Sequence, residues 1–172
     1  VCLLVLGMHR SGTSALTRVL SLSGAALPMN LIGPGEGNER GHWEPQRLVN
    51  FCEEILAELG SSWHDWRPLE LEKLSKSRIE QIQERFRTIV EEEFAGHDLF
   101  VVKDPRLCRL SQLFVAALEK GDIEVCPVLL VRNPLEVSAS LRQRSRLWSP
   151  HYSQAHSSLL WLSYVLAAEA ET

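Results

Sequence analysis

The sequence predicts a layered α/β fold, and three continuous apolar runs separated by helical patterns are the basis of this prediction. The runs cover residues 1–6, 99–102 and 125–131, and each is followed by apolar residues at helical spacing. A continuous apolar run is typical of a strand that is buried on both faces of a parallel sheet. Strands that alternate with helices predict right-handed crossovers, and therefore one domain of three α/β/α layers over residues 1–172.

The elements follow in order from the spacing of apolar residues. The first strand ends at Gly7, and Ala15, Leu16, Val19 and Leu20 then form the apolar stripe of a helix. Two more amphipathic helices are predicted before the second strand. Their apolar residues are Leu48, Cys52, Ile55, Leu56 and Leu59 in one, and Ile79, Ile82, Phe86, Ile89, Val90 and Phe94 in the other. Residues 27–43 contain four glycines and two prolines but no apolar period, which indicates a loop.

A capping residue before a proline predicts the start of two later helices. Asp104 precedes Pro105 and Asn133 precedes Pro134, so we expect a strand to end and a helix to begin at each pair. Glu136 is placed to complete a capping box with Asn133. A last helical pattern covers residues 159–171, so the chain starts inside an apolar run and stops inside a helical pattern. We therefore expect a longer native protein that continues beyond Thr172.

Charge and cysteine usage narrow the class of partner. No acidic residue precedes Glu36, whereas Arg10 and Arg18 lie in that stretch, so the N-terminal region can face an anion. The net charge of −4 argues against a nucleic-acid partner. The four cysteines form no C-x-x-C pair, which predicts reduced, mostly buried thiols, no metal site and a cytoplasmic location. No apolar run approaches the length of a membrane span.

Residues 7–14 form a glycine-containing turn between the first strand and the first helix. Such a turn aims backbone amides and the positive end of the helix at one point, which suits a phosphate or a sulfate. Gly7 and Gly12 have the spacing of a P-loop, but Thr13 stands where a nucleoside triphosphatase has lysine. Arg10 is then the cation of the loop. The sequence therefore predicts a P-loop-like nucleotide site and disfavours an ordinary ATPase or GTPase. A tight turn without a ligand is the plainer alternative.

The run Gly-Met-His-Arg-Ser-Gly-Thr-Ser resembles the 5′-phosphosulfate loop of sulfotransferases, especially the bacterial branch, in which a basic residue precedes Ser-Gly-Thr. The resemblance implies that Arg10 contacts the sulfuryl group and the bridging oxygen of the donor, 3′-phosphoadenosine 5′-phosphosulfate. It implies that six consecutive residues bind this donor. They are His9, Arg10, Ser11, Gly12, Thr13 and Ser14.

A second anion site is predicted where the third strand ends. Arg132 stands at the strand end and Ser140 lies eight residues further, so the two side chains can hold one phosphate from two sides. The pair resembles the 3′-phosphate signature of sulfotransferases. The likeness extends over residues 1–141 and is most specific at the two anion sites. Family members usually continue into a further segment that covers the nucleotide, and residues 1–172 lack it.

The resemblance implies transfer of a sulfuryl group to a hydroxyl or amine of a carbohydrate or other small acceptor, without a metal. Besides Arg10, two residues are candidates for the chemistry. Lys103 ends the second strand, where open α/β folds bind ligands, and Glu44 follows the glycine-rich loop as the candidate base. Asp104 is the alternative base, although a helix cap accounts for it. Two other functions stay open: a P-loop kinase that uses ATP, and a catalytically inactive nucleotide-binding module.

Overall fold

The computed structural model describes residues 1–35, 39, 41–145 and 152–170. Three parallel strands form one sheet in the order β2-β1-β3. The strands are β1 (Cys2–Leu6), β2 (Phe100–Lys103) and β3 (Val125–Leu129). The helices are α1 (Thr13–Leu22), α2 (Gln46–Glu58), the short 3₁₀ helix η1 (Leu71–Lys73), α3 (Lys76–Glu93), α4 (Leu107–Glu119), α5 (Pro134–Ser145) and α6 (Gln154–Glu169).

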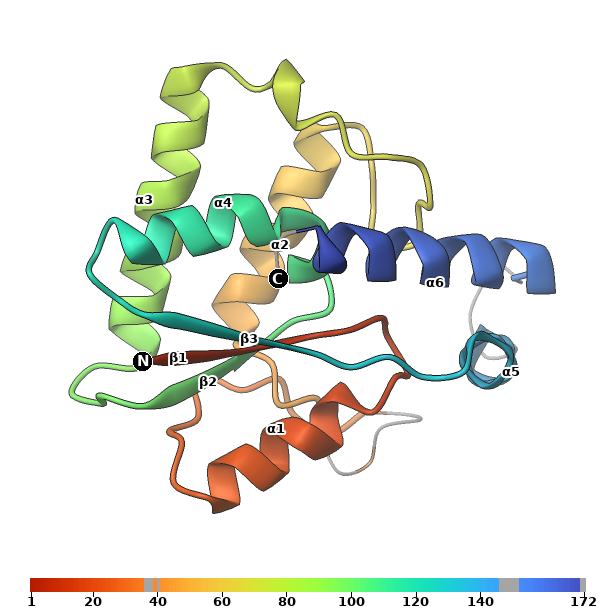
Figure 1. The fold of residues 1–172 in the computed structure, drawn as a ribbon, viewed down its shortest axis with the longest axis horizontal. Coiled ribbons are helices and arrows are strands. Elements are labelled where there is room, and N and C mark those ends of the chain that lie inside the picture. The colour runs from red at the N-terminus through yellow and green to blue at the C-terminus, as the bar shows by residue number, and fades with distance from the viewer. Residues whose placement is uncertain (36–38, 40, 146–151, 171–172) are drawn as a thin grey trace.

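Helices lie on both faces of this sheet, as the alternating pattern predicts (Figure 1). Helices α2, α3, α4 and α6 lie on one side, and α1 lies on the other. The larger core packs α2, α3 and α4 against β1 and β2, with Phe86 in contact with the rings of Phe51 and Phe114. A smaller core joins Val5 and Val101 to α1. The α/β class with a parallel sheet is therefore confirmed.

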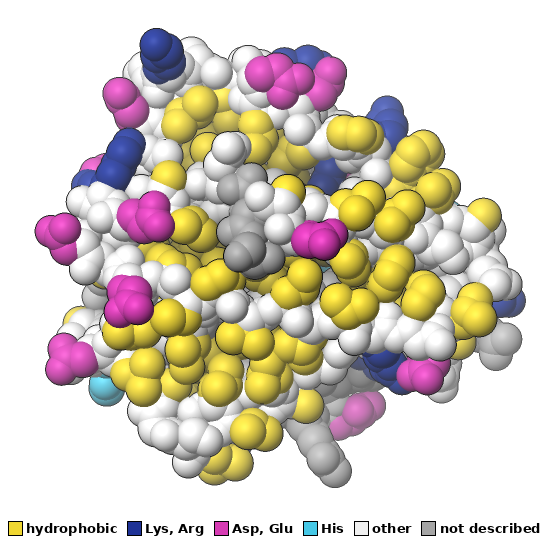
Figure 2. Space-filling model, in the orientation of Figure 1, with side chains coloured by type: hydrophobic (Ala, Val, Ile, Leu, Met, Phe, Trp, Pro, Cys, Tyr) yellow, Lys and Arg dark blue, Asp and Glu magenta, His cyan; other side chains and the backbone are white. Residues whose placement is uncertain are grey.

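The helix α1 and the strand β3 are less buried than their apolar sequences predict. Val19 and Val128 are exposed, and only Leu16 and Leu20 of the predicted α1 stripe pack against the smaller core. The prediction that the third strand is buried on both faces is wrong: α1 packs against β2 and β1, and β3 lies beyond β1 at the other edge of the sheet. Figure 2 shows hydrophobic side chains gathered over β3 and α6 on this face of the molecule.

The helix starts follow the two capping pairs with one shift. Asn133 caps α5, its side chain accepting a hydrogen bond from the Leu135 amide at 2.9 Å. Asp104 accepts from the Arg106 amide at 3.0 Å, but regular helix begins only at Leu107, because Asp104 heads a separate turn. The described part of the 27–43 segment contains no helix, as expected for a loop. None of the described helices combines the length and the apolar character needed to cross a membrane.

Candidate anion-binding cleft

The turn after β1 contains three residues with positive φ, Gly7, Arg10 and Gly12. Gly7 has φ of +151°, and a Cβ added there would lie 2.8 Å from the Leu130 carbonyl oxygen and 2.9 Å from Cγ2 of Thr13. Arg10, which is not glycine, has φ of 71°, in the left-handed region that side chains other than glycine rarely adopt. The loop therefore lies close against the end of β3 and keeps Arg10 in a conformation that costs free energy.

The close approach at Gly7 gives a first prediction. Gly7→Ala is expected to lower the free energy of unfolding by about 1 to 3 kcal/mol, because the added Cβ must push away the Leu130 carbonyl just after β3 and the Thr13 side chain at the start of α1. Gly33→Ala is the matched control, since a Cβ at Gly33 meets nothing within 4 Å. Urea denaturation measures both. Equal stability of the two variants would contradict the packing described for the loop.

The start of α1 presents donors with no internal partner. Among the described residues, the backbone amides of Gly12, Thr13 and Ser14 donate no hydrogen bond. The hydroxyl of Ser11 is likewise buried without a described partner. The Gly7 amide, in contrast, donates to Sγ of Cys108 at 3.1 Å, and burial raises the pKa of that thiol to about 12. The loop is thus fixed from behind and offers its donors at the helix start.

A cleft of about 550 Å³ opens at this helix start, on the carboxyl ends of the strands. Four of its lining residues are basic and one is acidic. The basic residues are Arg10, Arg18, Lys103 and Arg132, and the acidic residue is Glu44. Other lining residues include His9, Gly12, Thr13, Ser14, His42 and Trp43. The excess of positive charge suits an anionic ligand that carries more than one negative charge.

Lys103 and Glu44 form a buried ion pair beside the loop. The Lys103 side chain is 3% exposed and the Glu44 side chain 6%. The Lys103 ammonium donates to the Glu44 carboxylate, to Oγ of Ser14 at 3.2 Å and to the His42 carbonyl at 3.1 Å. Burial raises the pKa of the Glu44 carboxyl above its ordinary value, and the Lys103 ammonium offsets part of that rise. Lys103 therefore joins the start of α1 to the segment that precedes α2.

A second charged cluster supports this pair from the side of α2. The Arg106 guanidinium contacts Asp104 at 2.8 Å, Glu53 at 2.6 Å and the second oxygen of Glu44 at 3.9 Å. Asp104 is fully buried in this cluster. Its carboxylate caps the turn before α4 and pairs with Arg106. Asp104 therefore has the structural role of a cap, which the sequence offered beside the role of a base. Glu44, in contrast, lines the cleft.

Arg10, Arg132 and Ser140 meet although 130 residues separate the first from the last along the chain. Nε of Arg10 donates to Oγ of Ser140 at 2.9 Å. Nη1 of Arg132 donates to the backbone oxygen of Arg10, also at 2.9 Å. The two predicted anion sites are therefore adjacent and share Arg10. Ser140 contacts Arg10, whereas the sequence alone pairs it with Arg132 around one phosphate.

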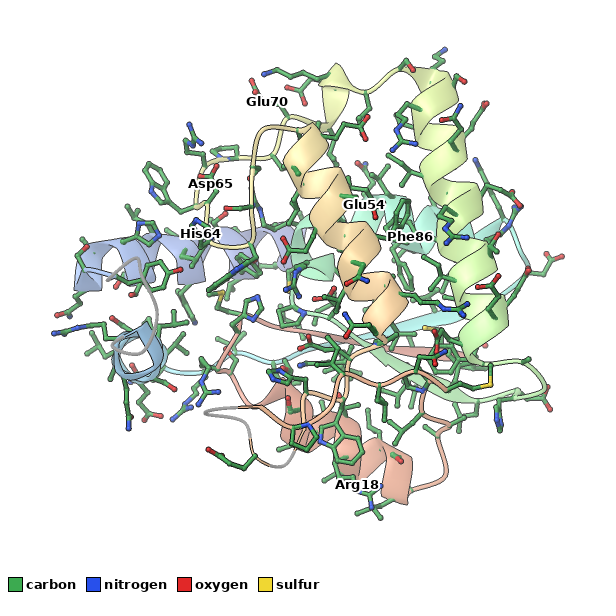
Figure 3. The ribbon with its side chains drawn as sticks, turned by 180° about the vertical axis from the view of Figure 1, so that it is seen from behind. Arg18, Glu54, His64, Asp65, Glu70 and Phe86 are labelled. Carbon is green, nitrogen blue, oxygen red and sulfur yellow. The ribbon has the colours of Figure 1, made fainter. Side chains whose placement is uncertain are left out.

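Two aromatic groups border the cleft. The imidazole of His9 lies 4.9 Å from the Trp63 ring and 5.9 Å from the Tyr164 ring, measured between centroids. The guanidinium carbon of Arg18, also in the cleft lining, lies 5.0 Å from the centroid of the Trp43 ring, a cation–π contact. Figure 3 labels Arg18, which projects from α1. These contacts pack two side chains of the cleft lining, His9 and Arg18, against aromatic rings.

The structure brings most of the predicted site residues to one cleft. Ser11 is buried beside it, and Ser140 contacts it through Arg10. Sequence reasoning missed the contribution of Arg106, because only the fold brings α2 beside the end of β2. It also missed the Arg18–Trp43 contact, for which the absence of acidic residues before Glu36 was the available signal.

Neither a metal-binding cluster among the described residues nor a similar known protein indicates the function of the cleft. The described residues contain no cluster of three or more histidine, cysteine or acidic side chains arranged to hold a metal ion. All four cysteines are free thiols, three of them buried and Cys126 partly exposed. Comparisons of the chain with protein-family models, with curated proteins and with solved structures found no match. The cleft itself is therefore the basis for any assignment of function.

Proposed function

We propose that this chain is a P-loop-like sulfotransferase that transfers a sulfuryl group from 3′-phosphoadenosine 5′-phosphosulfate to a hydroxyl or amine of a carbohydrate or small-molecule acceptor. The observation that carries the proposal is the convergence of Arg10, Arg132 and Ser140 beside the start of α1. This donor has two anionic ends, a phosphosulfate and a 3′-phosphate. Two adjacent groups of donors match that pattern better than a single triphosphate site does.

In the proposed reaction, the acceptor oxygen or nitrogen forms a bond to sulfur while the bond between sulfur and the bridging phosphate oxygen breaks. The leaving oxygen keeps the electron pair, and adenosine 3′,5′-bisphosphate departs. Arg10 and the amides at the start of α1 stabilise the negative charge that develops on that oxygen. Glu44 accepts the acceptor proton, and Lys103 holds Glu44 in place and adds positive charge to the cleft.

The binding of two adenine nucleotides tests the proposal. Calorimetry is expected to give a dissociation constant for adenosine 3′,5′-bisphosphate at least about tenfold lower than that for ADP, because only the former offers a phosphate to Arg132 and Ser140. EDTA is expected to leave this affinity unchanged, since arginine side chains and amides meet the charge. ATP chemistry would instead require Mg²⁺.

Arg132→Gln is expected to reduce the preference for the bisphosphate by about tenfold to a hundredfold, because a charge-assisted, two-point contact is lost. Arg78→Gln is the matched control, since Arg78 pairs with Glu58 on the surface and does not line the cleft. A wild-type protein that binds ADP with Mg²⁺ more tightly than the bisphosphate would support the kinase instead. Binding of the bisphosphate without consumption of the donor would indicate an inactive nucleotide-binding module.

A further inference from the structure

An acidic side chain occupies one edge of the guanidinium that the proposed function assigns to the 3′-phosphate. Oε2 of Glu136 accepts a hydrogen bond from Nε of Arg132 at 2.9 Å and lies 2.8 Å from Nη2 in an ion pair. Nη1 of the same guanidinium donates to the backbone oxygen of Arg10. The Glu136 carboxylate therefore pairs with Arg132, whereas the sequence predicts that it completes the capping box with Asn133.

The Nε–Nη2 edge is one that a phosphate uses when it binds arginine through two parallel hydrogen bonds. Glu136 and Ser140 are four residues apart on α5 and so share one face of that helix. The Glu136 side chain reaches Arg132 from this face. A phosphate that contacts both Arg132 and Ser140 must approach along the same face, where the Glu136 carboxylate already lies.

We propose that Glu136 competes with the 3′-phosphate of the donor for Arg132 and so lowers the preference of the site for 3′-phosphorylated nucleotides, an inference that rests on the proposed function. The ion pair is suited to exchange, because the Arg132 side chain is 41% exposed and that of Glu136 is 59% exposed. Exposed ion pairs contribute little stability, so a phosphate with two negative charges displaces the carboxylate at small cost. A ligand without a 3′-phosphate leaves the pair intact.

The position of Arg132 does not depend on Glu136 alone. Its guanidinium also donates to the Arg10 carbonyl, and its own carbonyl oxygen accepts from Nε1 of Trp161 on α6 at 3.0 Å. Arg132 therefore stays at the cleft when the carboxylate leaves. Removal of the Glu136 charge is expected to free the guanidinium edge for the ligand without loss of the site.

Calorimetric titration of Glu136→Gln with adenosine 3′,5′-bisphosphate and with AMP tests this inference. The variant is expected to bind the bisphosphate about threefold to tenfold more tightly than the wild type, since an internal competitor and its repulsion of the phosphate are both removed. Its affinity for AMP, which has no 3′-phosphate, is expected to stay within about twofold. Glu58→Gln is the matched control, because it removes the same charge from an exposed pair with Arg78.

The outcomes separate this inference from the proposed function. A wild-type preference for the bisphosphate over AMP, with unchanged or weaker binding in Glu136→Gln, would overturn the role of Glu136 and leave the sulfotransferase proposal standing. An equal gain for AMP would overturn it too. No preference for the bisphosphate in the wild type would overturn both. Glu136→Ala also removes the carboxylate and must change the affinity in the same direction, which guards against an effect of the glutamine side chain.

Discussion

Lys103→Met is expected to lower the free energy of unfolding by about 3 to 5 kcal/mol at pH 8, because it leaves the Glu44 carboxylate buried without its partner. The Lys103 ammonium makes three contacts, to Glu44, to Ser14 and to the His42 carbonyl, and methionine can replace none of them. The neighbouring guanidinium of Arg106 is 3.9 Å from Glu44 and already pairs with Asp104 and Glu53. It therefore compensates only weakly.

The loss of stability is expected to depend on pH in a defined direction. Burial already raises the pKa of Glu44 above its unfolded-state value, and removal of Lys103 leaves that rise without its main offset. The folded variant then binds a proton more readily than the unfolded chain does. Its stability relative to the wild type is therefore highest below the unfolded-state pKa and falls as the pH rises through the folded-state pKa. Urea denaturation at several pH values from 5 to 8 measures this dependence.

Two further variants make this result specific to the buried pair. Addition of Glu44→Gln to Lys103→Met is expected to restore much of the lost stability at pH 8, because no buried charge remains. Lys73→Met is the matched control, since Lys73 pairs with Glu70 on the surface and its loss is expected to cost less than about 1 kcal/mol. A cost below about 1 kcal/mol for Lys103→Met at pH 8 would show that the pair is not buried as described.

The elements that the sequence predicts best are those whose own apolar period decides their environment. Helices α2 and α3 bury the predicted stripes, including Cys52, Ile55 and Phe86, because each stripe meets the same core. Strand β3 has an equally apolar sequence, but α1 covers β2 and β1 at the other side of the sheet, and Val128 of β3 is exposed. The order of strands in a sheet is set by crossovers between distant segments, so no local pattern gives the position of β3.

In the cleft, too, the sequence predicts features set by neighbouring residues better than contacts between distant segments. Arg10, Thr13 and Ser14 line one cleft, as the strand-loop-helix context predicts, because the turn and the helix start are adjacent in the chain. Which side chain pairs with which is decided by packing: Ser140 contacts Arg10, and Glu136 contacts Arg132. The Arg106 cluster was missed for that reason, since Asp104 has a sufficient explanation as a helix cap in the sequence and acquires its charged neighbours only in the fold.

Arg10→Ala is expected to reduce consumption of the sulfate donor by about a hundredfold to a thousandfold, because the guanidinium is proposed to stabilise charge on the leaving oxygen. Binding of adenosine 3′,5′-bisphosphate, which has no sulfuryl group, is expected to weaken much less. A difference between the two effects is the mark of an interaction that strengthens in the transition state. The measurement is the release of bisphosphate from radiolabelled donor, with a mixture of amino sugars and simple hydroxyl compounds as acceptors.

The backbone of the loop supplies the control for this experiment. Arg10 has φ of 71°, which glycine adopts readily. Arg10→Gly therefore removes the guanidinium and also relieves the backbone strain, whereas Arg10→Ala removes the guanidinium and keeps the strain. Equal losses of turnover in the two variants would assign the effect to the side chain. Arg18→Ala removes another cation of the same cleft, one that contacts Trp43, and is expected to cost less than about tenfold. Turnover by both Arg10 variants within about threefold of the wild type would mean that the strained residue holds the loop and takes no part in sulfuryl transfer.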